Sequence, residues 1–162
     1  MIKLILLDRD GVINKELGGY VTNSDDFEVL PHVIPNLMKL KNAGIPTVVI
    51  TNQGGIAKGL YTHQTLAKIH QKLNLILKAH QLVFDEIYYC PHHTDFGKCL
   101  CRKPGSIMIE KALARFGINP QEAIMIGDTQ RDIEAANASG VKAVKIESNQ
   151  DWSSIIDEIL AH

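Results

Sequence analysis

Short apolar runs alternate with helical segments along this chain, and that alternation limits the folds open to it more than any other feature. Five runs are short and apolar enough to be buried strands: 3–7, 46–51, 84–90, 123–126 and 141–146. Helices are predicted between and after them, at 31–43, 62–80, 106–116, 132–139 and 152–160. Alternating strands and helices indicate parallel βαβ units. We therefore expect one α/β domain over residues 1–162, with a doubly wound, mostly parallel sheet and helices on both faces.

Composition and charge argue against several kinds of partner. The chain carries 17 Lys and Arg against 18 Asp and Glu, a formal charge of −1, whereas binding along a nucleic-acid backbone favours clustered basic residues. The apolar runs are far too short to cross a membrane, and the N-terminus reaches Asp8 too soon for a signal peptide. We therefore expect a cytoplasmic protein with no nucleic-acid or membrane partner. No linker or exposed heptad suggests an obligate partner chain, so we expect a monomer.

Two carboxylates, Asp8 and Asp10, follow the first predicted strand with one residue between them. Ligands of doubly wound sheets bind at the carboxyl ends of strands, and Asp8, Thr51 and Asp128 each fall at such an end. Phosphoryl transfer needs a nucleophile, positive charge and a proton donor for the leaving oxygen, and Mg²⁺ supplies charge to oxygen ligands. Taken alone, however, Asp8 and Asp10 could equally be two solvent-exposed aspartates in a turn, with no part in phosphoryl transfer.

Three further sets of polar residues would fit a site for phosphoryl transfer, but each also has an ordinary structural explanation. Thr51 offers a hydroxyl to a phosphoryl oxygen, or it caps a helix. Arg102 and Lys103 place two cations before a helix, or they form a solvated basic pair. Asp128 and Asp132 follow the fourth predicted strand, and the ordinary alternative is that Asp132 caps or pairs on the helix that it opens. None of these sets identifies a function alone.

Together they do. Asp-x-Asp-Gly, Thr-Asn, Lys and Gly-Asp-x-x-x-Asp, in this order and each after its predicted strand or loop, resemble the motifs of the haloacid dehalogenase superfamily of phosphatases over residues 1–146. The resemblance implies that Asp8 attacks phosphorus and carries the phosphoryl group. It implies that Asp10 protonates the leaving oxygen and then activates water, and that Thr51 and Lys103 stabilise the phosphoryl oxygens. The implied substrate is a small phosphorylated metabolite.

The same resemblance implies a catalytic Mg²⁺ bound to Asp8, to the backbone carbonyl of Asp10 and to Asp128, with Asp132 supporting the site. Asp8 must be ionised to attack, so we expect Mg²⁺ and Lys103 to lower its pKa. Asp10 must hold a proton for part of the reaction, so we expect its carboxylate to stay off the metal. Binding through the backbone carbonyl meets that need.

All three cysteines of the chain lie in one predicted loop. Cys90-x-His92 and Cys99-x-Cys101 offer three thiolates and one imidazole, a closed tetrahedral set for a structural Zn²⁺. An odd, clustered set does not fit a secreted disulfide framework. His93 is the competing imidazole, and His92 is preferred because a one-residue gap then occurs on both sides. Three free thiols beside an incidental histidine are the alternative.

The chain has both the motif at residues 8–14 and the zinc loop, about residues 90–103. In this combination it resembles one subgroup of the superfamily. It contains the D-glycero-D-manno-heptose 1,7-bisphosphate 7-phosphatases, which act on the way to ADP-heptose for lipopolysaccharide, and the histidinol-phosphatases. Three segments are closer to the heptose enzymes: 19–21, 55–61 and 88–93. The short gap between His92 and Cys99 is nearer the histidinol type, and Gly54 stands where Ser is usual. Heptose bisphosphate is therefore the expected substrate, and histidinol phosphate the alternative.

The intervals that separate Asp8, Thr51 and Lys103 are filled by predicted core elements, so no separate cap domain fits. The zinc loop and residues 15–26 must then shape the pocket. By resemblance, Arg102 contacts a second phosphate or another polar group of the substrate. Further substrate contacts are expected from Asn52, Gln53, Glu16, Gly19 and Tyr20. A nucleic-acid 3′-phosphatase and a non-catalytic, zinc-stabilised binding module are disfavoured, because the charge is near neutral and every catalytic position is filled.

Overall fold

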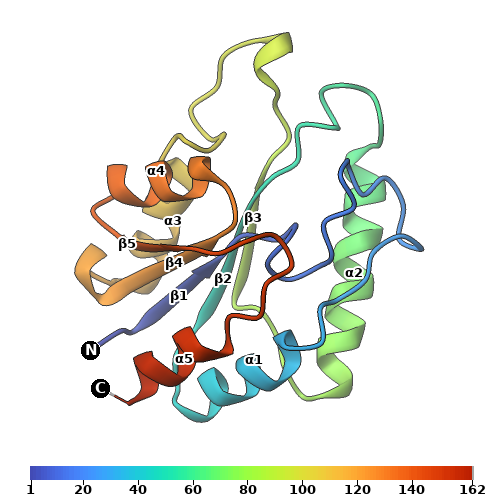
Figure 1. Ribbon diagram of the computed structural model, residues 1–162. Helices are drawn as coiled ribbons and strands as arrows, with labels where there is room; N and C mark the ends of the chain where they lie inside the picture. The colour runs from blue at the N-terminus through green and yellow to red at the C-terminus, as the bar shows by residue number, and fades with distance from the viewer. Residues whose placement is uncertain (162) are drawn as a thin grey trace.

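The structure, a computed structural model, describes residues 1–161. These residues form a five-stranded sheet in the order β3-β2-β1-β4-β5, with helices on both faces (Figure 1). All neighbouring strands pair in parallel. The predicted doubly wound α/β architecture is therefore confirmed. The strands are β1 (Leu4–Leu7), β2 (Thr47–Asn52), β3 (Glu86–Cys90), β4 (Ala123–Gly127) and β5 (Lys142–Lys145).

Helices bury both faces of the sheet, because successive side chains of a strand point to opposite faces. The face that carries Ile5 and Leu7 of β1 packs against α1, α2 and α5. The face that carries Leu4 and Leu6 packs against α3 and α4. A parallel sheet needs such cover on both sides. The helices are α1 (Val33–Asn42), α2 (His63–Ala79), α3 (Ile107–Phe116), α4 (Gln130–Ala138) and α5 (Ser153–Leu160).

Two short 3₁₀ helices are absent from the sequence-based prediction. They are η1 (Thr94–Phe96), within the cysteine loop, and η2 (Pro120–Glu122), just before β4. At η2 the carboxylate of Glu122 accepts a hydrogen bond from the backbone N–H of Asn119 at 3.4 Å. A single turn is too short to show the apolar periodicity that identifies longer helices. The order of the other elements is as predicted.

The carboxyl ends of the strands share one edge of the sheet, and this edge positions the candidate site. From β1 the chain moves to β2 and β3 on one side and then to β4 and β5 on the other, so the strand order switches between β1 and β4. Ligands of open α/β sheets bind at such a switch. The loop after β3, which carries η1, extends beyond this edge at the top of Figure 1. Residues 1–161 contain no separate cap domain and no helix long and apolar enough to cross a membrane.

Candidate active site

Asp8 follows β1 and lies at the floor of a cleft, with 7% of its surface exposed. Its Oδ1 accepts hydrogen bonds from the backbone N–H of Arg9 at 2.8 Å and from Lys103 Nζ at 2.9 Å. Lys103 Nζ also contacts Asp132 Oδ1 at 2.5 Å and donates to the Ile50 carbonyl at 2.7 Å. One buried ammonium group therefore joins two buried carboxylates that are far apart in the sequence.

Burial, together with the negative charge of Asp132, raises the pKa of Asp8 well above its usual value. Lys103 acts in the opposite direction, as the sequence led us to expect, but its effect is smaller. The lowering that we expect from Mg²⁺ and Lys103 together stays a prediction, because the raised pKa is that of the protein alone. Burial and like charge both disfavour the ionised carboxylate. An ionised Asp8 therefore needs more positive charge than Lys103 supplies.

Three carboxylates form a cluster that fits Mg²⁺. Asp8, Asp128 and Asp132 each place one oxygen within 4.8 Å of the others. The Oδ2 of Asp128 accepts a hydrogen bond from Ser148, whereas its Oδ1 is buried without a hydrogen-bond partner in residues 1–161. Gly11, with φ of +83°, leaves the space that the Asp128 carboxylate fills, because a Cβ at Gly11 would collide with it. A hard divalent cation suits this all-oxygen set and would satisfy the open oxygen.

The carboxylate of Asp10 is not part of this cluster, and three side-chain donors hold it. Arg9 Nη2 at 2.8 Å and Asn14 Nδ2 at 2.9 Å donate to its Oδ1, and Gln53 Nε2 donates to its Oδ2 at 3.0 Å. Burial alone would raise the pKa of Asp10, but the Arg9 charge and these three donors lower it below its usual value. The ionised form is therefore favoured in the protein alone, because the Arg9 guanidinium is fully buried beside it. The proton that Asp10 is expected to hold for part of the reaction stays a prediction.

Asn52 fixes the position of Lys103, which arrives from the long loop after β3. Asn52 Nδ2 donates to the Lys103 carbonyl at 3.0 Å, and the Lys103 N–H donates to Asn52 Oδ1 at 2.9 Å. The neighbouring Thr51 is the last residue but one of β2 and has 1% of its surface exposed, and its hydroxyl accepts a hydrogen bond from Gln53 at 2.9 Å. Thr51 thus lies beneath the cleft and does not line it. Its contact with a phosphoryl oxygen stays a prediction.

The cleft above these groups has a volume of about 310 Å³. All six predicted substrate contacts line it: Glu16, Gly19, Tyr20, Asn52, Gln53 and Arg102. Sequence reasoning missed Thr129 and Arg131, which line the cleft beside Asp132, and it weighed His93 only as a zinc ligand. Gly54 is closely surrounded here, since a Cβ would lie 2.9 Å from Arg102 Nη1 and 3.0 Å from both the His92 carbonyl oxygen and His93 Cδ2.

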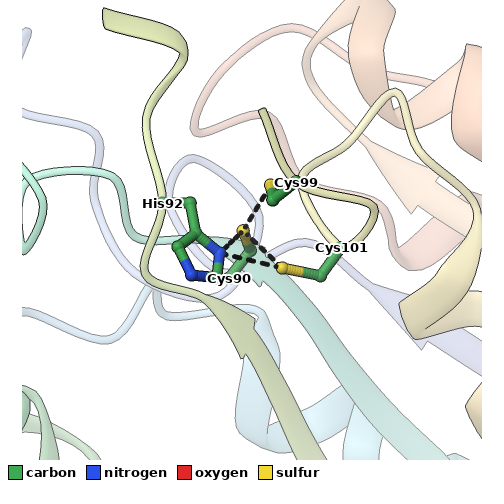
Figure 2. Close-up of side chains that lie close together, drawn as sticks. All are labelled: Cys90, His92, Cys99 and Cys101. Carbon is green, nitrogen blue, oxygen red and sulfur yellow. Dashed lines mark hydrogen bonds between the residues drawn. The ribbon is translucent and has the colours of Figure 1, made fainter. Parts of the chain in front are cut away.

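The four predicted zinc ligands come together at the end of β3 (Figure 2). The Sγ of Cys90 lies 3.7 Å from the Sγ of Cys99 and 2.9 Å from that of Cys101. The Nδ1 of His92 lies 3.5 Å from Cys90 Sγ and 3.2 Å from Cys101 Sγ. Burial raises the pKa of the Cys90 thiol, so a thiolate there requires a nearby cation. The set of donor atoms fits tetrahedral Zn²⁺, and His92, not His93, belongs to it.

A doubly wound sheet that gathers Asp8, Lys103, Asp128 and Asp132 at the ends of its strands defines a haloacid dehalogenase-like hydrolase. Residues 2–140 match that family, and the chain belongs to it.

The chain is similar to named proteins in sequence and in structure. A D-glycero-beta-D-manno-heptose-1,7-bisphosphate 7-phosphatase of Haemophilus influenzae is 38% identical over 148 residues, which cover 88% of this chain and 79% of the relative. A D-glycero-D-manno-heptose-1,7-bisphosphate 7-phosphatase of Chlorobaculum tepidum is 31% identical and aligns over 96% of this chain and 84% of its own length. The crystal structure of a D,D-heptose 1,7-bisphosphate phosphatase from B. bronchiseptica, complexed with magnesium and phosphate, superposes with a TM-score of 0.87 at 30% identity and covers 99% of both chains. A putative phosphatase of this family from Mesorhizobium loti superposes with a TM-score of 0.86 at 25% identity, over 99% of this chain and 85% of that one.

Proposed function

We propose that this protein is a phosphatase that removes the 7-phosphate of D-glycero-D-manno-heptose 1,7-bisphosphate, through a phosphorylated aspartate at Asp8. The observation that carries the proposal is the buried contact of Asp8 with Lys103 at the floor of a polar cleft. Relatives and solved structures named for this heptose bisphosphate support the substrate over histidinol phosphate. The reaction would belong to the formation of ADP-heptose for lipopolysaccharide.

The side chains of the cleft can perform each step of such a hydrolysis. A carboxylate oxygen of Asp8 attacks phosphorus while the bond from phosphorus to the ester oxygen breaks, and Asp10 gives its proton to the leaving alcohol. Asp10 then takes a proton from water, whose oxygen attacks the phosphoaspartate and releases phosphate. Lys103 neutralises charge on the phosphoryl oxygens throughout. Asp10 must gain a proton when substrate arrives, because its ionised form is favoured in the protein alone.

Two metal ions complete the proposal. Asp8, Asp128 and the backbone carbonyl of Asp10 would hold Mg²⁺, which supplies positive charge to the phosphoryl oxygens and offsets the carboxylate cluster. Cys90, His92, Cys99 and Cys101 would hold a structural Zn²⁺. Zinc at this place would order the loop that delivers Arg102 and Lys103. The expectations of a monomer and of a cytoplasmic location stay predictions.

Phosphate release measured on purified protein tests the proposal. We expect Mg²⁺-dependent turnover of the heptose bisphosphate with a kcat/KM well above that for histidinol phosphate. Asp8→Asn should abolish turnover and leave the fold intact, whereas Asp157→Asn, at an exposed aspartate of α5 away from the cleft, should leave turnover unchanged. Turnover retained by Asp8→Asn would refute the nucleophile. A higher kcat/KM for histidinol phosphate would refute the substrate.

A further inference from the structure

A buried hydrogen-bond chain runs from Tyr61 through Gln53 to Asp10, and the chemistry described above gives Tyr61 no role. Tyr61, 5% exposed, donates its hydroxyl proton to Gln53 Oε1 at 2.5 Å. Gln53, 2% exposed, donates from Nε2 to Asp10 Oδ2 at 3.0 Å and to Thr51 Oγ1 at 2.9 Å. One amide group therefore contacts the proton donor and the hydroxyl predicted to bind the phosphoryl group.

The direction of these hydrogen bonds sets what each group can do. A glutamine amide has an acceptor end and a donor end, and its NH₂ has two protons. With the Tyr61 proton on Oε1, both Nε2 protons are directed at Asp10 and Thr51. The Thr51 oxygen accepts from Gln53, and the Thr51 hydroxyl proton has only a long contact, 3.5 Å, with the Asn52 carbonyl. By donating to Oε1, the Tyr61 hydroxyl fixes the orientation of the Gln53 amide group.

Tyr61 is itself held firmly. Gly55 lets its ring lie against the backbone, because a Cβ at Gly55 would collide with the Tyr61 ring. The ring of Tyr20, on the loop predicted to contact substrate, packs on it with centroids 6.3 Å apart. Just after Tyr61, Thr62 caps α2 by accepting a hydrogen bond from the Thr65 N–H at 3.1 Å. The hydroxyl is therefore presented from a fixed backbone at the start of a long helix.

We infer that Tyr61 is a positioning residue: its hydroxyl fixes the Gln53 amide, which in turn holds Asp10 in line with the leaving-group oxygen. This inference rests on the proposed function, in which Asp10 protonates the departing alcohol. An alkyl alcohol needs that proton as it leaves, whereas 4-nitrophenolate is stable enough to leave without it. Misplacing Asp10 should therefore penalise alkyl phosphates and spare 4-nitrophenyl phosphate.

The test compares kcat/KM for the heptose bisphosphate and for 4-nitrophenyl phosphate, because kcat/KM reports the steps up to loss of the leaving group and excludes the later hydrolysis. Tyr61→Phe keeps the ring and removes only the hydroxyl. We expect kcat/KM for the heptose bisphosphate to fall about tenfold, part of the 10²–10⁴-fold that a general acid contributes, and kcat/KM for 4-nitrophenyl phosphate to change less than about twofold. Gln53→Ala should give the same selective loss, and adding Tyr61→Phe to it should cost nothing more.

Controls separate this role from a general loss of structure and from a failure of the proposed function. Tyr89→Phe removes another tyrosine hydroxyl, one that contacts His63 Nδ1 at 2.9 Å on the exposed surface, and should leave both substrates unaffected. Equal losses on both substrates, no loss in Tyr61→Phe, or additive losses in the double variant would each overturn the inference. If the wild type turns over neither ester, or Asp8→Asn retains turnover, the proposed function itself fails.

Discussion

Replacing Lys103 by Met should destabilise this protein more than any loss of an exposed ion pair. The Lys103 side chain is 3% exposed, and its Nζ lies 2.9 Å from Asp8 and 2.5 Å from Asp132. Methionine retains the length and apolar character of the lysine stem and removes the charge. Two buried carboxylates and the Ile50 carbonyl, 2.7 Å from Nζ, then lose their shared donor.

The expected loss of stability follows from the two buried carboxylates that Lys103→Met leaves without a cation. Removing one partner of a buried ion pair costs about 3–5 kcal/mol, because the other charge is left uncompensated. A domain of this size has a total stability of about 5–15 kcal/mol, so the loss is a large fraction of it. An exposed pair of similar length gives the comparison. Lys39 lies 2.5 Å from Asp157, with the two side chains 40% and 60% exposed, and Lys39→Met should cost at most about 1 kcal/mol.

The destabilisation should depend on pH in a definite direction. The folded-state pKa of Asp8 lies above the unfolded value of 3.8 because of burial and Asp132. The folded state therefore binds this proton more tightly, and its stability falls as pH rises through the raised pKa. Lys103 lowers the pKa of Asp8 in the wild type, so the variant should have a still higher pKa. The difference in stability between wild type and Lys103→Met should then be greatest near neutral pH and shrink on acidification.

Urea unfolding followed by circular dichroism, in buffer without added Mg²⁺, measures both effects. Wild type, Lys103→Met and Lys39→Met would be compared at about pH 8 and about pH 5, because acidification moves Asp8 toward its protonated form. A loss below about 1 kcal/mol for Lys103→Met would show that the buried carboxylates do not depend on this cation. A difference that grows on acidification would refute the pKa argument.

The remaining predictions concern the cysteine cluster and the core. Purified protein should contain one Zn²⁺ per chain by elemental analysis, and Cys99→Ser should lower both the zinc content and the melting temperature; full zinc content in the variant would exclude Cys99 as a ligand. Trp152 is fully buried and its Nε1 donates to the Val12 carbonyl at 3.0 Å. Trp152→Phe should therefore lower the free energy of unfolding by about 1–3 kcal/mol, and a urea midpoint equal to that of the wild type would contradict this.

The sheet and its helices were predictable because their signals are local. The run at 4–7 is wholly apolar and ends in an aspartate, and Leu66, Ile69 and Leu73 in α2 recur at helical spacing. Periodicity of this kind depends only on which face of an element is buried. η1 and η2 were missed because a single turn has no periodicity. The local signals for η2 were Pro120 at its first position and the capping contact between Asn119 and Glu122.

The site was predictable in its motif residues and not in the side chains that surround them. Asp8, Lys103 and Asp128 were found because each stands at a fixed place after a strand or loop. Arg9 was treated as a spacer between two aspartates, yet its guanidinium is fully buried and is what favours the ionised form of Asp10. Tyr61 lies in the segment 55–61 that resembles the heptose enzymes, but its role could not be predicted because it depends on the side-chain contact with Gln53. Burial and tertiary contacts set pKa values and amide orientations, and sequence spacing does not report them.

Paired hydrogen bonds between Asn52 and the backbone of Lys103 tie this lysine to the end of β2. The sheet, through Asn52, therefore helps to set where the ammonium group lies beside Asp8. A change in the length of the loop between His92 and Cys99 should alter the wall of the cleft and leave this ammonium group in place.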